Sequence, residues 1–410
     1  MMTFLDWVSR DGKLLLTARI VRTFSYGFLS IVLAIYLKLM GFNEIFIGIV
    51  LTATLVNSVI FNIFASFYAD KIGRKKILII YAVLMAISGT IFLVTNNYVA
   101  LIISALIGTI NVTGTEVGAF LSIEQAILPQ TVNDIKKRNS IFSIYNMAGT
   151  FAMSGGVLLS GFPQYMQKLY GLNQVESIRT LFLFYSACAV VVIGIYFFLS
   201  KKIELAPNIS KDTSIRTISP KSKGIIAKLS SLFAVDSFAG GFVIQSIVSF
   251  WFFSKFGADL TTLSYIFSIA GVLTAFSFLF ATKIAYRIGL INTMVFTHIP
   301  SNVLLILLAF APTFPIAIGV YLARMSLSQM DVPTRQSYIV AVVNEDERIA
   351  AAGITNTSRN IAQAVSPSLA GAIIQSLSLS APFVVGGLLK IVYDIGVYVS
   401  FRKIKPPEES

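Results

Sequence analysis

Long apolar segments alternate with short polar ones along the whole chain. A membrane-crossing helix needs about 20 mostly apolar residues. Residues 45–69, 180–200 and 261–282 are long enough and contain no Asp, Glu, Lys or Arg. A transmembrane β-strand would instead show segments of about ten residues with alternating hydrophobicity, and no such pattern is present. The pattern therefore predicts an all-α membrane protein.

The number of apolar segments predicts how often the chain crosses the membrane. Residues 290–323 are also free of these charged residues, but this segment is too long for one crossing. Pro312 and Pro315 divide it into two helices. The twelve predicted transmembrane helices are residues 14–37, 45–69, 77–95, 98–122, 140–161, 180–200, 229–254, 261–282, 290–310, 314–340, 349–374 and 382–400.

The longest polar stretch divides the chain into two parts of six predicted helices. Residues 201–228 contain Pro207, Pro220 and seven basic residues, which is typical of a linker outside the membrane. We therefore expect an N-terminal six-helix bundle at 1–200, a cytosolic linker at 201–228 and a C-terminal six-helix bundle at 229–410.

A weak internal repeat relates the two predicted bundles. The sequence YADKIG at 68–73 and the sequence IAYRIG at 284–289 lie 216 positions apart, each between equivalent spans. Gly41 and Gly257 share this offset, and Gly161 and Gly371 are 210 positions apart. The pattern indicates two pseudo-symmetric bundles related by an axis along the membrane normal, which is a transporter architecture.

Composition excludes several classes of protein. Of the 410 residues, 56% are hydrophobic and only 12% are charged, against about 25% in an ordinary soluble domain. One cysteine, Cys188, excludes a disulfide framework and a cysteine metal cluster. The chain also lacks the motifs of phosphate-binding loops, zinc hydrolases and nucleophile elbows. We therefore expect no enzyme activity, no cofactor and no metal site.

The distribution of basic residues predicts the orientation. Of the 32 Lys and Arg residues, 22 fall in the terminal segments or in loops on the same side, six lie within spans, and four fall on the opposite side. These four are Lys38, Lys168, Arg179 and Lys255. The positive-inside rule places both termini in the cytosol. The net charge of +13 thus indicates contact with membrane lipid, here of the plasma membrane, rather than nucleic-acid binding.

One motif resembles the signature of a known family. The sequence from Ser66 to Lys76 reads S-x-x-x-D-K-x-G-R-K-K and follows the second predicted span. It resembles the loop signature of the major facilitator superfamily, except that Ser66 replaces a glycine. A further stretch, 331–348, resembles prokaryotic permeases of that superfamily. The resemblance implies two six-helix bundles and a secondary transporter.

The resemblance also implies a latch between the bundles on the cytosolic side. In the superfamily, the residue matching Asp70 caps the N-terminus of the eleventh helix across the two halves, where the helix dipole favours an anion. Gly73 allows the tight turn, and we expect Arg74 to pair with Glu124 or, second, with Asp134. Arg359, in the eleventh span, is assigned to the same gate.

Ionisable residues within the predicted spans are the candidate functional groups, because they are costly in a bilayer. Helices one, four, seven and ten line the central cavity in the superfamily, and they hold most of these charges. The candidates for a substrate or proton site are Arg19, Arg22, Glu116, Asp236, Arg324, Asp331 and Arg335.

Two explanations for these charges remain open at this point. They bind an anionic or zwitterionic substrate or relay a proton through Glu116 or Asp236, or they form ion pairs that hold or switch the bundles. The i,i+4 spacing predicts local pairs between Asp331 and Arg335 and between Lys390 and Asp394. His298, in a peripheral span, is interpreted as a packing residue.

The sequence therefore predicts a secondary active transporter that moves a small organic solute by alternating access, coupled to protons as symport or antiport. We expect a monomer whose partner is a small-molecule substrate. A facilitated-diffusion uniporter and a non-transporting receptor or scaffold with the same fold remain alternatives. An intramembrane enzyme is disfavoured by the missing motifs.

Overall fold

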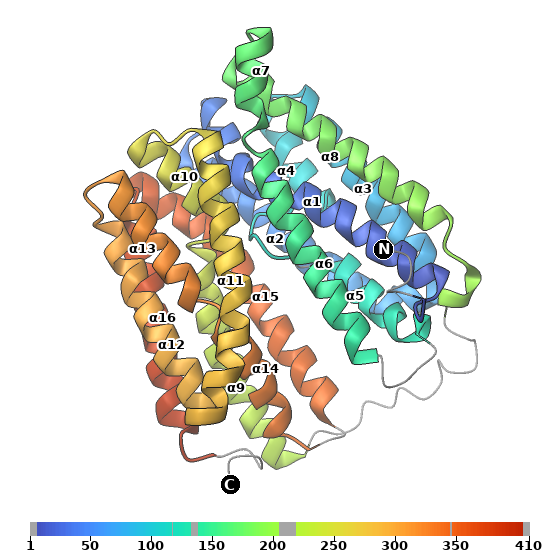
Figure 1. The fold of residues 1–410 in the computed structure, drawn as a ribbon, viewed down its shortest axis with the longest axis vertical. Coiled ribbons are helices and arrows are strands. Elements are labelled where there is room, and N and C mark those ends of the chain that lie inside the picture. The colour runs from blue at the N-terminus through green and yellow to red at the C-terminus, as the bar shows by residue number, and fades with distance from the viewer. Residues whose placement is uncertain (1–5, 117, 133–137, 205–218, 345–346, 405–410) are drawn as a thin grey trace.

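The computed structural model describes residues 6–116, 118–132, 138–204, 219–344 and 347–404. Within these ranges the regular structure is helical, apart from one isolated bridge between Val8 and Val132. Figure 1 shows the helices in two groups, with α1 to α8 on one side and α9 to α16 on the other. We call these groups the N-half and the C-half.

The helices of the N-half are α1 (Arg10–Leu39), α2 (Glu44–Ile72), α3 (Arg74–Val94), α4 (Tyr98–Ile107), α5 (Ala119–Ile127), α6 (Arg138–Leu159), α7 (Phe162–Tyr170) and α8 (Gln174–Phe197). The helices of the C-half are α9 (Pro220–Gly241), α10 (Gln245–Phe256), α11 (Leu260–Ile288), α12 (Leu290–Ala309), α13 (Phe314–Leu327), α14 (Asp331–Ala341), α15 (Arg348–Ser376) and α16 (Ala381–Phe401). Helix α9 thus begins inside the stretch predicted as linker.

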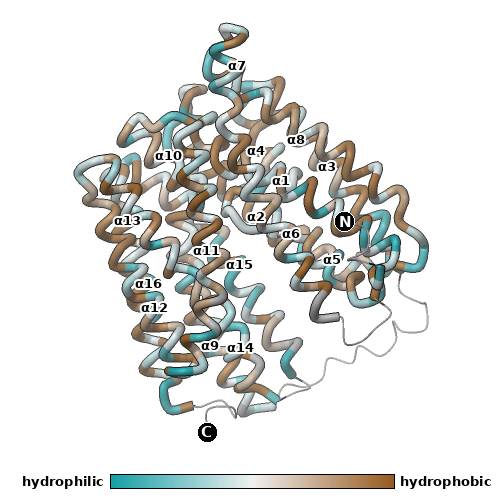
Figure 2. The backbone as a smooth tube through the Cα atoms, in the orientation of Figure 1, coloured by the Kyte–Doolittle hydropathy of each residue, from teal (hydrophilic) through white to brown (hydrophobic). Residues whose placement is uncertain are grey.

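The helices have the length and hydrophobicity of membrane spans. Nine helical segments of the described chain are long and apolar enough to cross a bilayer. The other three predicted spans correspond to α4 with α5, α13 with α14, and the more polar α15. Figure 2 shows hydrophobic residues along the outer helices and hydrophilic residues near the helix ends. The chain is therefore a multi-pass, all-α membrane protein.

Three of the predicted spans, 98–122, 229–254 and 314–340, are each built from two helices rather than from one continuous helix. The breaks lie between α4 and α5, between α9 and α10, and between α13 and α14. In the first break, the Asn111 side chain accepts from the Thr113 N–H (2.9 Å) and donates to the Thr115 carbonyl (2.6 Å). Such local side-chain bonds compete with the helix and satisfy the freed backbone.

The glycines of the repeat confirm that the halves are equivalent. Gly73 and Gly289 end α2 and α11 with φ of 110° and 86°. Gly41 and Gly257 follow α1 and α10 with φ of 88° and 65°. A side chain is strained in this left-handed region, so glycine is favoured at each of these four turns.

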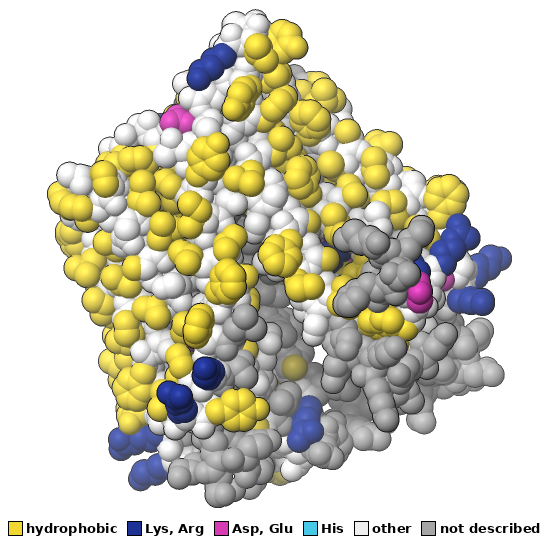
Figure 3. All heavy atoms as spheres, viewed as in Figure 1, with side chains coloured by type: hydrophobic (Ala, Val, Ile, Leu, Met, Phe, Trp, Pro, Cys, Tyr) yellow, Lys and Arg dark blue, Asp and Glu magenta, His cyan; other side chains and the backbone are white. Residues whose placement is uncertain are grey.

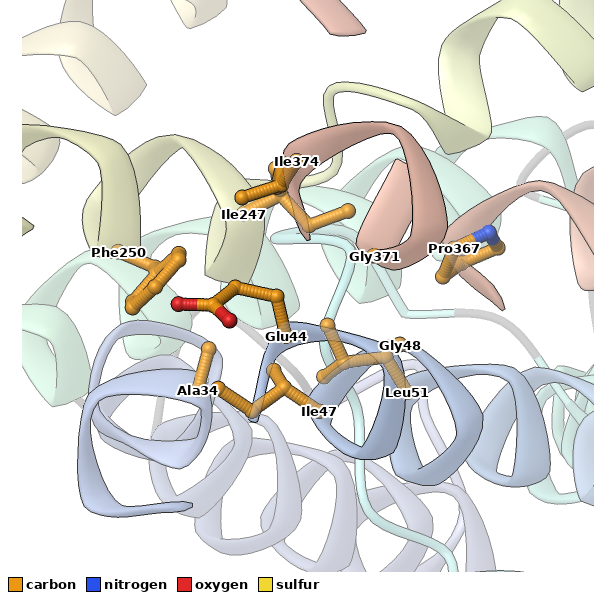
Figure 4. Close-up of a pocket in the computed structure, with 10 residues that line it drawn as sticks. All are labelled: Ala34, Glu44, Ile47, Gly48, Leu51, Ile247, Phe250, Pro367, Gly371 and Ile374. Atoms are coloured by element: carbon orange, nitrogen blue, oxygen red, sulfur yellow. The ribbon is translucent and has the colours of Figure 1, made fainter. Parts of the chain in front are cut away.

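The halves are joined at the end of the molecule that holds Gly41, Gly257 and Leu377, which we call the closed end. The Ser368 hydroxyl of α15 lies 2.7 Å from the Thr52 hydroxyl of α2. Helices α2 and α15 cross at close distance. A Cβ on Gly371 would stand 2.2 Å from the Glu44 carbonyl, so only glycine fits there. Figure 4 shows the mostly apolar pocket at this seam, with the Glu44 carboxylate beside Phe250.

The opposite end, which we call the open end, carries Gly73, Gly289 and the start of α15. Figure 1 places α5 and α14 toward this end in different halves. The space-filling view in Figure 3 shows the surface hollowed between the two halves in this region. The hollow therefore opens toward one end of the molecule.

Candidate functional site

Two of the interrupted spans meet across the halves. The Ser246 N–H of α10 donates to the Val112 carbonyl in the break of the fourth span (3.2 Å). The neighbouring Gln245 side chain donates to the Ser30 hydroxyl of α1 (2.9 Å), and it packs against Gly114. Broken helices at mid-membrane are where transporters of this architecture place their binding sites.

A buried charged cluster lies within the N-half and is centred on Arg22 of α1. Its guanidinium binds Glu124 through two nitrogens, at 2.7 and 3.1 Å, and its Nε binds Glu116 at 2.8 Å. Both Arg22 and Glu124 are fully buried. The members of this N-half cluster are Arg19, Arg22, Glu116, Glu124, Tyr145 and Tyr196.

The other members complete the coordination of the two glutamates. Arg19 Nη1 lies 2.5 Å from Glu116 Oε2, and its guanidinium covers the Tyr145 ring at 3.9 Å. The Tyr145 hydroxyl donates to Glu124, as does the Tyr196 hydroxyl at 2.6 Å. The arginines of the first span and the glutamates of the fourth thus lie at the same depth. Two guanidiniums face two carboxylates, so the formal charge of this cluster is balanced.

A second buried cluster lies within the C-half around Asp236 of α9. This carboxylate accepts from Lys390 Nζ (2.6 Å), Arg359 Nη1 (3.2 Å) and Arg335 Nη1 (3.3 Å). Arg335 also pairs with Asp331 at 2.7 Å, as the i,i+4 spacing predicts. The members of this C-half cluster are Asp236, His298, Asn302, Asp331, Arg335, Arg359, Lys390 and Asp394.

The predicted pair between Lys390 and Asp394 is wrong. Lys390 turns to Asp236, whereas Asp394 binds His298 Nδ1 (2.8 Å) and the Asn302 amide (2.9 Å) on α12. Both residues share a face of α16, but partners on neighbouring helices offer closer contacts. His298 therefore packs as predicted and is also hydrogen-bonded into the charged cluster, which the sequence did not indicate.

The C-half cluster is balanced as well. Three cations (Arg335, Arg359, Lys390) face three carboxylates (Asp236, Asp331, Asp394), with His298 beside them. Opposite charges in close contact offset the desolvation that each would suffer alone. Each cluster ties together helices of a single half, so most of the intramembrane charges stabilise the bundles themselves.

The loop motif is bonded within the N-half. Arg74 Nε binds Asp70 at 2.7 Å, so the predicted pair between Arg74 and Glu124 is wrong, because Glu124 is enclosed by Arg22 and two tyrosines. The alternative partner Asp134 lies outside the described residues. Glu204 caps α3 by accepting from the backbone N–H groups of Arg74 (2.7 Å) and Lys75 (3.2 Å).

Sequence reasoning missed this cap, although an acid facing the start of a basic helix is favoured by the helix dipole. The other residues assigned to the latch also bind within their own halves. The Asp70 side chain is half exposed and is paired with Arg74, and Arg359 belongs to the C-half cluster. The start of α15 is held by Glu347, which accepts from the Ser219 N–H at 2.5 Å. That hydrogen bond is the main reason why the pKa of Glu347 is lowered to about 2.

Arg324 is the one candidate that lies apart from both clusters. It is buried on α13, three residues before the interruption of the tenth span. Its surroundings differ from those of the other intramembrane cations and are described below.

Two membrane or drug-resistance proteins share sequence with this chain. An uncharacterized membrane protein of Saccharomyces cerevisiae, YJR124C, is 26% identical over an alignment of 417 positions that covers 94% of this chain and 93% of the yeast protein. The quinolone resistance protein NorA of Staphylococcus aureus is 33% identical over 82 residues, or 20% of this chain and 21% of NorA.

Solved structures share the fold at low identity. The nucleoside transporter NupG matches with a TM-score of 0.72 and 16% identity, over 96% of this chain and 99% of NupG. A D-xylose–proton symporter matches with a TM-score of 0.71 and 15% identity, over 94% of this chain and 97% of the symporter. The profile of the Major Facilitator Superfamily matches residues 15–330. With its paired six-span halves and its loop motif, the chain belongs to the Major Facilitator Superfamily of transporters.

Proposed function

We propose that this protein moves a small organic solute across the plasma membrane by alternating access and is coupled to protons. The observation that carries the proposal is the asymmetry between its ends. The halves are hydrogen-bonded at the closed end, and a hollow opens between them at the other. Rocking of the two bundles, 1–200 and 229–410, about the central broken helices would expose the same site to either side.

The orientation follows from the basic loops. Gly73, Gly289 and the chain segments around Arg10 and Arg402 lie toward the open end, on the side that carries most of the Lys and Arg residues. The positive-inside rule assigns this side, and both termini, to the cytosol. The structure then corresponds to an inward-facing state, and the closed end faces outward.

Asp70 is the proposed latch of the opposite, outward-facing state. In the superfamily the matching acid caps the eleventh helix when the cytosolic side is closed, and this cap is released in the inward-facing state. The half-exposed position of Asp70 and its bond to Arg74 fit the released state. When the cytosolic side closes, the positive end of α15 would attract the carboxylate.

The variant Asp70→Asn tests this latch. We expect slower transport, by about threefold to tenfold, because the amide loses an interaction of roughly 1 kcal/mol with the helix dipole. Folding should be intact, since Asp70 is exposed. Lys71→Gln changes the neighbouring charge and is the matched control. Transport in liposomes that is equal in Asp70→Asn and wild type would contradict the latch.

Proton coupling is assigned to the buried carboxylates of the two charged clusters. Glu116 is held by Arg19 and Arg22, and Asp236 by three cations. Protonation of either acid would release its cations and loosen one half. Because Glu116 is on the segment that meets the C-half near Val112, it is the better placed of the two.

The test is solute flux in liposomes with and without a pH gradient, using a solute selected by a thermal-shift screen of the purified protein. We expect the gradient to accelerate flux in wild type and to have no effect in Glu116→Gln, because a glutamine cannot bind and release the proton. The exposed capping residue Glu176 offers the control Glu176→Gln. If the wild-type flux did not change with the pH gradient, a uniporter would be favoured. If no stabilising solute were transported, a receptor would be favoured.

A further inference from the structure

Arg324 is a buried cation with unused hydrogen-bonding capacity. Only 9% of its surface is exposed, and its one polar contact among the described residues joins Nη1 to the Met325 sulfur at 3.4 Å. Its Nε is buried without a hydrogen-bond partner. In the described chain the other five buried Lys and Arg side chains each lie 2.5 to 2.7 Å from a carboxylate; they are Arg19, Arg22, Arg74, Arg335 and Lys390.

The missing acidic partner of Arg324 matters because the other buried charges are balanced. Both charged clusters are neutral by formal count, so Arg324 adds an uncompensated positive charge within the membrane. A guanidinium stays protonated and has five N–H donors that it cannot fill with one thioether. The carbonyls at the end of α13 supply a partial negative charge, but burial of an unpaired cation still costs free energy.

Arg324 lies near the middle of the membrane, the depth at which transporters of this architecture bind their substrates. It lies ten residues after Phe314, where α13 begins near the closed end. At 1.5 Å per residue this is about 15 Å, half the thickness of the hydrocarbon core. The carbonyl of the next residue, Met325, accepts a hydrogen bond from the Thr274 hydroxyl of α11 (3.4 Å). Thr274 lies one turn after Gly271 on this helix. At Gly271, α11 packs against Ser154 of the N-half.

The side chains packed beside Arg324 are apolar and aromatic. Tyr321 is buried one turn before Arg324, and its ring contacts the buried rings of Phe252 and Phe267 at centroid distances of 5.6 and 5.2 Å. Ligand sites are lined mainly by apolar and aromatic side chains, with a few polar groups that fix orientation. A guanidinium beside aromatic rings suits a carboxylate on an apolar body, because its planar fork binds the two oxygens of a carboxylate at once.

We propose that Arg324 binds the anionic group of the solute, and that the solutes are small organic anions with an apolar or aromatic body. This inference rests on the proposed transport function. The bound anion neutralises the uncompensated charge, so the loaded protein carries balanced charge at the centre of the membrane. Arg324 then differs in kind from the arginines of the clusters, which bind the protein's own acids.

The first measurement is thermal stabilisation of the purified full-length protein by matched probes. The anions are benzoate, phenylacetate and phenyl phosphate, and the neutral counterparts are benzamide and phenylacetamide. We expect at least one anion to raise the melting temperature more than its neutral counterpart, with apparent affinity at least about tenfold lower in Arg324→Gln. Lys255→Gln, a cation at the closed end stacked on Trp251, is the control and should bind as wild type.

A second measurement needs no ligand. Without solute, Arg324→Met should melt at a higher temperature than wild type, because it removes an unpaired buried charge. A lower melting temperature would show that Arg324 stabilises the fold and would overturn the proposal. The proposal would also fail if no anion stabilised the protein beyond its neutral counterpart, or if Arg324→Gln left the preference for anions unchanged.

Failure of this inference can be told apart from failure of the transport function. Arg324-dependent binding of an anion without any flux in liposomes would support the site and contradict transport. Flux of a neutral solute that is indifferent to Arg324→Gln would support transport and contradict the anion site.

Discussion

Glu124→Ala is expected to lower the free energy of unfolding by about 3–5 kcal/mol, the cost of breaking a buried ion pair by removing one partner. Glu124 is fully buried and accepts from Arg22, Tyr145 and Tyr196. Its removal leaves the two hydroxyls without their acceptor and leaves Arg22 with Glu116 alone. Denaturant titration in detergent micelles measures the loss.

Two further variants separate the ion pair from general damage. The double variant Arg22→Met with Glu124→Leu removes both partners and should recover part of the loss, because an apolar pair of similar volume is often neutral, whereas the Tyr145 and Tyr196 hydroxyls still lack their acceptor. Glu44→Ala breaks the more exposed pair with Lys38 and should cost about 1 kcal/mol or less. A near-neutral Glu124→Ala, or a double variant less stable than the single, would contradict the structural role of this cluster.

Much of the fold could be predicted because hydrophobic length is a strong signal in membrane proteins. Most of the spans, the two-part organisation and the glycines at Gly73 and Gly289 follow from local composition, although α9 begins inside the stretch predicted as linker. That intramembrane charges form ion pairs was one of the two explanations that the sequence left open, since unpaired charges in a bilayer are costly.

The helix interruptions could not be predicted from hydrophobic length. Between Gly108 and Gly118 the chain stays apolar enough to suggest a continuous span, and only its Asn, Thr and Gly content signals a break. Whether such residues break a helix depends on what surrounds them. Here Asn57 accommodates the end of α4 by donating to the Leu106 carbonyl (2.6 Å), a contact between different spans.

The two wrong pairs have different causes. Spacing in sequence predicts partners on the same helix, but the C-half offers closer ones on neighbouring helices, so Lys390 binds Asp236 rather than Asp394. The pair between Arg74 and Glu124 was implied by the family resemblance, and it does not form because Glu124 is enclosed by Arg22 and two tyrosines. For Arg324, the lack of an acidic partner could not be predicted from sequence, because it could be recognised only once the neighbouring helices were in place.

The central claim is that the two halves rock, which requires the closed end to open during transport. Thr52 of α2 and Ser368 of α15 join the halves there, with their hydroxyls 2.7 Å apart. Cysteine side chains at these two positions would be close enough to form a disulfide. The variant Thr52→Cys with Ser368→Cys, in a background carrying Cys188→Ala, can therefore be locked by oxidation.

Solute flux through this variant in liposomes, before oxidation, after oxidation and after reduction, is the most direct test. We predict that oxidation reduces flux at least about a hundredfold and that reduction restores it, because a locked protein cannot face outward. The single variant Thr52→Cys should not respond to oxidation. Undiminished flux in fully cross-linked protein would show that the closed end need not open, and alternating access by rocking halves would be contradicted.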